Sequence, residues 1–268
     1  MSNLARTLLI AVVLAAAAAA YWWYNLRTAE PPPAPPPAAT ASAPKPAASE
    51  PAVKYPVEAS GAPTLTPDDV PAALNDLLGR KAVSSFLQVD DFARRFVATA
   101  DNLGRAHAPS IVWPVMPTGG RFTVEDTPDG PVIAADNSSR YTPFVLLVET
   151  IDIGRAVGLY MRMYPLLQEA YRNLGFPKRY FNDRLIEVID QLLATPDVNG
   201  PIKVHLTEVK GPVPSVRPWV RYEYADPALQ SLSAGQKILV RVGPVNERRL
   251  KAKLAEIREQ LAKTPPTR

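Results

Sequence analysis

The chain has 268 residues, of which 47% are hydrophobic and 21% are charged, a balance typical of a globular protein rather than a disordered one. The net charge is +4, but lysine and arginine alternate with aspartate and glutamate, so the sequence lacks the dense basic stripe of a nucleic-acid-binding protein. Cysteine is absent from the sequence, which excludes disulfides, thiol catalysis and cysteine-ligated metals.

The first predicted element is an apolar segment over residues 8–24, in which no side chain is charged. As a helix it spans about 25 Å at ~1.5 Å per residue, which is at the short end for a bilayer core of ~30 Å. We interpret it as a transmembrane signal-anchor helix that follows a short cytoplasmic tail, residues 1–7. The alternative interpretation is a secretory signal peptide that is cleaved after Ala20.

Four aromatic residues at the end of this segment favour the anchor. After cleavage they would lie at a free N-terminus with nothing to bury them, whereas in an anchor they lie at the membrane interface, where amphipathic rings are favoured. Positive charge before the segment, including Arg6, favours a cytoplasmic N-terminus. We therefore predict a single-pass protein of the bacterial inner membrane with a periplasmic C-terminal domain. The predicted interface residues are Tyr21, Trp22, Trp23 and Tyr24.

Residues 25–64 form a segment rich in proline and alanine. Such a composition cannot bury enough surface to offset the entropy of ordering the chain, so we predict a disordered linker. Its proline clusters favour the extended polyproline II conformation, which suits a spacer. Docking of this segment to a partner protein is the alternative.

A single globular domain is predicted over residues 65–263, followed by a disordered tail, residues 264–268. Its first helix begins at Thr66, whose hydroxyl can cap a turn that opens with proline and two acids. Short alternating runs around the sequence TPDG predict a β-hairpin, and WVRYEYA is typical of a strand or extended edge. Pro165 is expected to kink or break its helix. Other helices are predicted over residues 89–103, 142–164, 165–174, 182–193, 236–243 and 244–261. The expected fold is therefore mainly α, a multi-helix domain with a small β-hairpin and one or two short extended segments.

Two stretches, residues 160–193 and 222–261, resemble the Gram-negative bacterial family called domain of unknown function 3014. The resemblance covers residues 65–261 and is strongest from Arg140 onward. It implies an N-terminal anchor and a Pro/Ala linker, and it implies no activity. The family-motif residues, whose role is unknown, are Arg140, Tyr141, Tyr164, Pro165, Tyr171, Asp226, Gln236, Lys237, Arg241 and Gly243.

The sequence shows no constellation for catalysis or for a metal or other cofactor. His205 and Glu208 form an H-x-x-E pair, but no third ligand accompanies them, and the other histidine, His107, stands apart. Motifs of serine hydrolases and of phosphate-binding loops are missing from the folded region. We interpret the paired acids as helix-capping or solvated groups. These pairs are Asp68/Asp69, Asp90/Asp91, Glu125/Asp126 and Glu187/Asp190.

Two hypotheses for function follow. The first is a non-enzymatic module on a tether that binds a periplasmic protein partner. The alternative is a cell-envelope enzyme or ligand-binding domain with a groove built from arginine and tyrosine, which bind acidic groups and glycans through charge and stacking. The same side chains could equally pack the core and its rim. This set comprises Arg140, Tyr141, Tyr160, Arg162, Tyr164, Tyr171, Arg172, Arg179, Tyr180, Arg221 and Tyr222.

Overall fold

The computed structural model describes residues 52–57, 61–208 and 217–263. The chain divides into two compact units, Met1–Ser49 and Glu50–Arg268, and every described residue belongs to the second. The predicted cytoplasmic tail, the anchor with its four interface aromatics and the C-terminal tail lie outside the described residues. Within the described part, none of the helices combines the length and the apolar character needed to cross a membrane.

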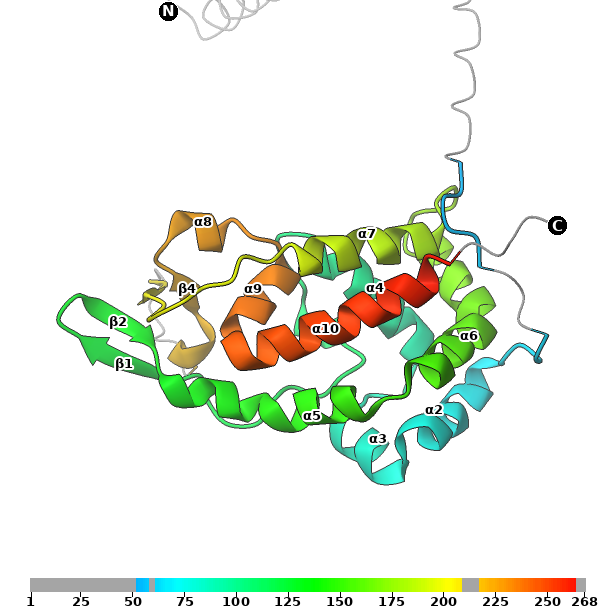
Figure 1. Ribbon diagram of the computed structural model, residues 1–268, viewed down its shortest axis with the longest axis horizontal. Helices are drawn as coiled ribbons and strands as arrows, with labels where there is room; N and C mark the ends of the chain where they lie inside the picture. Colours follow the sequence, from blue (N-terminus) through cyan, green and yellow to red (C-terminus); the bar gives the residue numbers. More distant parts are fainter. Residues whose placement is uncertain (1–51, 58–60, 209–216, 264–268) are drawn as a thin grey trace, which may run out of the picture. The chain divides into compact units, whose positions relative to one another are not determined.

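The described unit is mainly helical, as the sequence pattern predicts (Figure 1). Its α-helices are α2 (Val70–Leu78), α3 (Arg80–Phe86), α4 (Phe92–Leu103), α5 (Thr142–Thr150), α6 (Ile153–Asn173), α7 (Phe181–Leu193), α8 (Pro227–Gln230), α9 (Ala234–Arg241) and α10 (Pro244–Leu261). Short 3-10 helices are η1 (Pro67–Asp69), η2 (Ser110–Val112), η3 (Ala135–Arg140) and η4 (Pro218–Val220). The strands are β1 (Val124–Thr127), β2 (Gly130–Ile133), β3 (Val204–Leu206) and β4 (Tyr222–Tyr224).

The helix that contains Pro165 corrects one prediction. The sequence predicts a kink or break there, but α6 is a single helix on both sides of the proline. Proline lacks an N–H donor and disfavours the helix. However, Val157 before it and Tyr171 after it are buried in the same core cluster, and this shared packing keeps the helix together. Pro165 itself is exposed.

The helix α3 is absent from the sequence prediction, which has no helix between Gly79 and Val89. Gly79 has a φ of 83°, which glycine adopts readily, and this allows the chain to turn directly from α2 into α3. The predicted capping box at Ser233 is confirmed, because its hydroxyl accepts from Gln236 N and the Gln236 side chain accepts from Ser233 N.

The predicted β-hairpin is confirmed as the antiparallel pair β1–β2, with Thr127 opposite Gly130 at the turn. Part of WVRYEYA forms β4, which pairs antiparallel with β3. An isolated bridge between Val132 and Lys203 connects the two pairs. A small cluster of buried side chains, Val204, Tyr224 and Val240, anchors this β region to α9.

Residues 52–57 correct the predicted boundary of the linker. The sequence pattern assigns residues 25–64 to an unpacked linker, but the Lys54 and Tyr55 amides donate to the Asp183 carboxylate at 3.0 and 2.8 Å. The Val57 amide donates to Tyr180 Oη at 2.7 Å. The polar groups at the start of α7 thus hold this segment by its backbone amides. The hydrophobic pattern of the sequence does not reveal such contacts, because they do not depend on the side chains of the segment.

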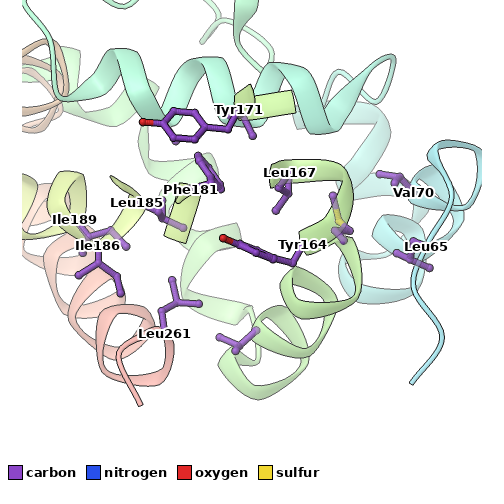
Figure 2. Packing of buried hydrophobic residues seen from close by; sticks show 14 of the residues in the cluster. Leu65, Val70, Tyr164, Leu167, Tyr171, Phe181, Leu185, Ile186, Ile189 and Leu261 are labelled. Carbon is purple, nitrogen blue, oxygen red and sulfur yellow. The ribbon is translucent and has the colours of Figure 1, made fainter. Parts of the chain in front are cut away.

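The main core lies where α2, α4, α6, α7 and the end of α10 meet. Tyr164, Leu167, Tyr171 and Phe181 gather there from α6 and α7 (Figure 2). Tyr171 and Phe181 are fully buried. Away from this cluster, α10 lies between α5 and α7 and contacts both (Figure 1). The space enclosed by these helices contains the candidate site.

Candidate binding site

A cavity of about 990 Å³ lies among α4, α5, α6, α7 and α10. Its lining is mostly aliphatic and aromatic and includes Phe92 and Phe96 of α4, Leu159 and Met163 of α6, and Leu254 of α10. These side chains follow the helical periods that the sequence shows, since each helix turns one apolar stripe inward. An apolar chain of a ligand would find matching surroundings here.

The segment 113–119 closes one side of this cavity. It is held by its backbone, because Gln88 N donates to Pro114 O and Met116 N donates to Phe86 O, both at 2.8 Å. The Arg95 guanidinium secures the preceding residues by donating to Ile111 O at 2.7 Å. The cavity wall is thus fixed by hydrogen bonds.

A second cavity of about 300 Å³ adjoins the first, and four residues line both: Thr118, Arg140, Tyr141 and Arg241. Its other walls are largely aromatic and include Phe122, Trp219 and Tyr222. Among the described residues that line the two cavities, the charged ones are Arg140 and Arg241. The pair of cavities therefore has an apolar body and a cationic, aromatic end.

Arg140 is held in place by its neighbours. Its Nε donates to Gly119 O at 3.0 Å, Nη1 to Asn137 Oδ1 at 3.2 Å and Nη2 to Gly120 O at 3.4 Å. None of these acceptors is a carboxylate, and no ion pair within the described residues includes Arg140. A guanidinium has five N–H donors, so these bonds leave two for a ligand.

Arg241 lies between two rings. Its guanidinium carbon is 5.3 Å from the centroid of Phe122 and 5.2 Å from that of Tyr224, an arrangement that stabilises a cation. Its Nη2 donates to Tyr222 O at 3.2 Å, while its buried Nε has no hydrogen-bond partner among the described residues. Like Arg140, it has no carboxylate partner in the described part of the chain.

Tyr224 supports Arg241, whose guanidinium lies over its ring. Burial raises the pKa of its hydroxyl to about 12, and the positive charge of Arg241 lowers it in part. The hydroxyl is therefore neutral at physiological pH and donates to Lys237 O at 2.8 Å. Lys237, a family-motif residue, thus contributes its backbone carbonyl to the support of the site.

Most of the rest of the predicted arginine–tyrosine set lies outside the two cavities, but Tyr160 of α6 lines the large one. Tyr164, one turn further along α6, belongs to the main core, and burial raises the pKa of both hydroxyls. Tyr171 is fully buried against Phe176, with ring centroids 4.7 Å apart. Arg162 donates to Pro63 O at 3.1 Å. For Tyr164, Tyr171 and Arg162, which line neither cavity, the packing interpretation fits the structure.

Arg221, which only the alternative hypothesis assigns to a groove, lines neither cavity. Its Nη1 donates to Thr207 O at 2.9 Å, directly beside the Leu206–Tyr222 pair of β3 and β4. Its neighbour Tyr222 does line the smaller cavity, and its ring lies 5.5 Å from that of Phe122.

The remaining family-motif residues shape the backbone. Asp226 caps α8 by accepting from Ala228 N at 2.8 Å. Gln236 completes its capping box and also donates to Gln191 O at 3.0 Å. Gly243 has a φ of 88°, and a Cβ there would lie 2.8 Å from Ser138 Cβ. This glycine lets α10 begin directly beside η3, and so helps to bring Arg140 and Arg241 to one place.

The acids and histidines found in the sequence take structural or surface positions. Asp69 accepts from Thr66, which lowers the pKa of its carboxyl, and Asp190 lies 2.7 Å from Arg258 Nε. His205 Nε2 lies 3.6 Å from Glu223 Oε2, so its neighbour is not the Glu208 of the H-x-x-E pair. No group of three or more His, Cys, Asp or Glu in the described part is placed to hold a metal ion.

Sequence reasoning misses Phe122, Trp219, Thr118 and Gly120 as parts of the site. Thr118, Gly120 and Phe122 lie in the loop between η2 and β1, and Trp219 lies in the short 3-10 helix η4, so no helical or strand periodicity connects them. The clustering of aromatic and basic residues in RPWVRYEY is the signal that could have indicated this region.

Comparison with known proteins identifies the family. The family model described as protein of unknown function (DUF3014) matches residues 92–258, from the start of α4 almost to the end of α10. No curated protein and no solved structure matches the chain. The matched region includes Arg140 and Arg241 and most of the lining of both cavities. As the sequence resemblance predicts, the chain belongs to the DUF3014 family of proteins of unknown function.

Proposed function

We propose that this domain is a ligand-binding module of the bacterial cell envelope, whose large cavity takes the apolar chain of an amphiphilic molecule. The observation that supports this most strongly is the volume of about 990 Å³ with its aliphatic and aromatic lining. Ligand sites in proteins are concave, mostly apolar and of roughly 300–1,000 Å³, with a few polar groups that orient the ligand. The cavity has these properties, and its charged lining groups, both guanidiniums, suit binding of an anion.

The location is part of the same proposal. The predicted anchor and linker would place the domain on the periplasmic side of the inner membrane, where molecules with apolar chains are plentiful. The tethered protein-interaction module stays a second prediction. What favours it is the exposure of large apolar side chains, with Ile111 79% and Val220 67% exposed.

The test is photo-crosslinking of the full chain in cells that are given a fatty acid carrying a photoreactive group and an alkyne tag. We expect adducts on peptides of α4, α6 and α10, which face the cavity. The substitution Ala156→Trp fills the cavity from α6 and should remove most of these adducts. The matched control is Ala255→Trp on the exposed face of α10, which should leave them unchanged.

The length of the competing chain provides a quantitative readout. Each methylene buried in an apolar site contributes about 0.8 kcal/mol. Among chains short enough to fit inside the cavity, each methylene removed should therefore weaken competition up to about fourfold. Adducts spread evenly over the surface, or equal adducts in the Ala156→Trp and Ala255→Trp variants, would contradict the proposal.

A further inference from the structure

The two arginines at the junction of the cavities have no carboxylate partner among the described residues. Several other cations of this unit pair with carboxylates, as Arg184 does with Asp101 at 2.9 Å and Lys251 with Glu247 at 2.8 Å. Others, such as Arg95 and Arg162, donate to backbone carbonyls but line neither cavity. Arg140 and Arg241 have neutral acceptors only, among the described residues. Leaving a cation half-buried without a counterion costs free energy, so a fold that holds two of them together favours an external anion.

Both guanidiniums are fixed before any ligand arrives. Arg140 is held by two loop carbonyls and the Asn137 amide oxygen, and Arg241 by the rings of Phe122 and Tyr224. A planar guanidinium with fixed orientation binds carboxylate or phosphate oxygens with little loss of side-chain entropy. The arrangement is therefore organised in advance for an oxyanion.

The position of this pair is specific. Both arginines line the apolar cavity of about 990 Å³ and the polar, aromatic cavity of about 300 Å³. A ligand that fills the first with a chain would thus place its end group at the guanidiniums. A further cation, Arg121, stacks over Trp219 at 4.2 Å and adds positive charge beside the smaller cavity.

We infer that the ligand is an anionic amphiphile, with its apolar chain in the large cavity and its carboxylate or phosphate head bound between Arg140 and Arg241. This inference rests on the proposed function, since it names the chemistry of the ligand's other end. The shared head-group chemistry is an oxyanion, which charge-assisted hydrogen bonds from two guanidiniums recognise.

The test uses isolated membranes from cells that express the full chain, and measures competition against cross-linking of the photoreactive fatty acid. The competitors share one chain and differ in the head: dodecanoate, dodecyl phosphate, dodecanol and dodecyltrimethylammonium. We expect the two anions to compete about tenfold to a hundredfold better than dodecanol, the range for hydrogen bonds to charged groups. The cation should be the weakest, because it is repelled. Whichever anion competes better identifies the head as a carboxylate or a phosphate.

The variants Arg140→Gln and Arg241→Gln should each reduce the preference for anion over alcohol to a few-fold or less, while dodecanol competes as in the wild type. Retained competition by dodecanol also shows that the variant is folded. If Arg241→Gln disrupts the fold because its stacking between two rings is lost, Arg140→Gln still tests the head-group inference by itself. The matched control is Arg248→Gln on the exposed face of α10, which removes the same charge and should preserve the preference.

The possible failures are distinct. If neither dodecanol nor the anions compete, the proposed function is wrong. If dodecanol and dodecanoate compete equally in the wild type, or if the preference survives in both arginine variants, the apolar site stands and the head-group inference is overturned. Competition by inorganic phosphate alone, at the concentrations at which dodecyl phosphate acts, would also overturn it, because the anion would then be bound without the chain.

Discussion

Two regions of this domain differ in how their polar side chains are paired. In the core at the start of α7, polar groups satisfy one another: Tyr160 donates to Asn182, and Tyr164 donates to Gln168, both at 3.0 Å. At the cavity junction, Arg140 and Arg241 keep donors that no described residue accepts. The difference shows that residue type alone does not indicate a site. The hydroxyl of Tyr171 in the core also has no hydrogen-bond partner among the described residues, but it is neutral and lines neither cavity. What distinguishes the junction is that its unpaired donors belong to cations that line a cavity.

The strongest test of this comparison is Asn182→Leu. Asn182 is fully buried, and its side chain accepts from Tyr160 and donates to Tyr55 O at 2.9 Å and Leu261 O at 3.4 Å. Removing three hydrogen bonds and leaving their partners unpaired should lower the free energy of unfolding by about 3 kcal/mol. Denaturant unfolding of the full chain, followed by circular dichroism, measures the loss.

The matched control for that change is Asn173→Leu, at the exposed end of α6, which should alter the free energy of unfolding by less than about 0.5 kcal/mol. Equal effects of the two changes would show that the hydrogen-bond network at the start of α7 does not stabilise the fold. The contrast between a paired core and an unpaired junction would then have no energetic basis.

The second test addresses how the fold brings the two arginines together. Gly243→Ala introduces a Cβ at a φ of 88° and within 2.8 Å of Ser138 Cβ, so η3 and α10 must separate. We expect a loss of about 2 kcal/mol in the free energy of unfolding, from backbone strain and overpacking. Because η3 ends at Arg140 and α9 ends at Arg241, the preference for anionic competitors should fall as well.

Gly158→Ala is the control for this glycine. Its added Cβ meets nothing within 4 Å on α6, so it should be neutral or stabilise by up to about 1 kcal/mol. Unchanged stability and unchanged anion preference in Gly243→Ala would contradict the role that we assign to this glycine.

The third test uses pH and concerns the buried support of the site. The pKa of Tyr224 is raised from 10 to about 12, so its neutral hydroxyl stabilises the fold fully below pH 10. This contribution should be lost as the pH rises from about 10 to 12, by at most about 2–3 kcal/mol. Unfolding measured from pH 8 to 12 gives the slope, and Tyr224→Phe should make it shallower. An unchanged slope in this variant would indicate that Tyr160 and Tyr164, whose pKa values are also raised, account for the loss.

Much of the fold could be predicted from local pattern. The stripes of α4, α7 and α10, the capping box at Ser233 and the hairpin around Gly130 each depend on residues near one another in sequence, so periodicity and turn chemistry detect them. The continuity of α6 through Pro165 could not be predicted, because packing of distant residues outweighs the local penalty. The docking of residues 52–57 depends on Tyr180 and Asp183, more than a hundred positions away.

The candidate site divides in the same way. The sequence by itself identifies the family resemblance, the mainly helical class and Arg140, Tyr141 and Arg241 as motif residues. It does not separate Tyr141 from Tyr164 or Tyr171, which have the same side chain and a structural role. Only the tertiary structure decides this, because whether a side chain lines a cavity depends on the segments packed around it. The two cavities here are lined by a loop, a 3-10 helix, a strand and several helices that are distant in the chain.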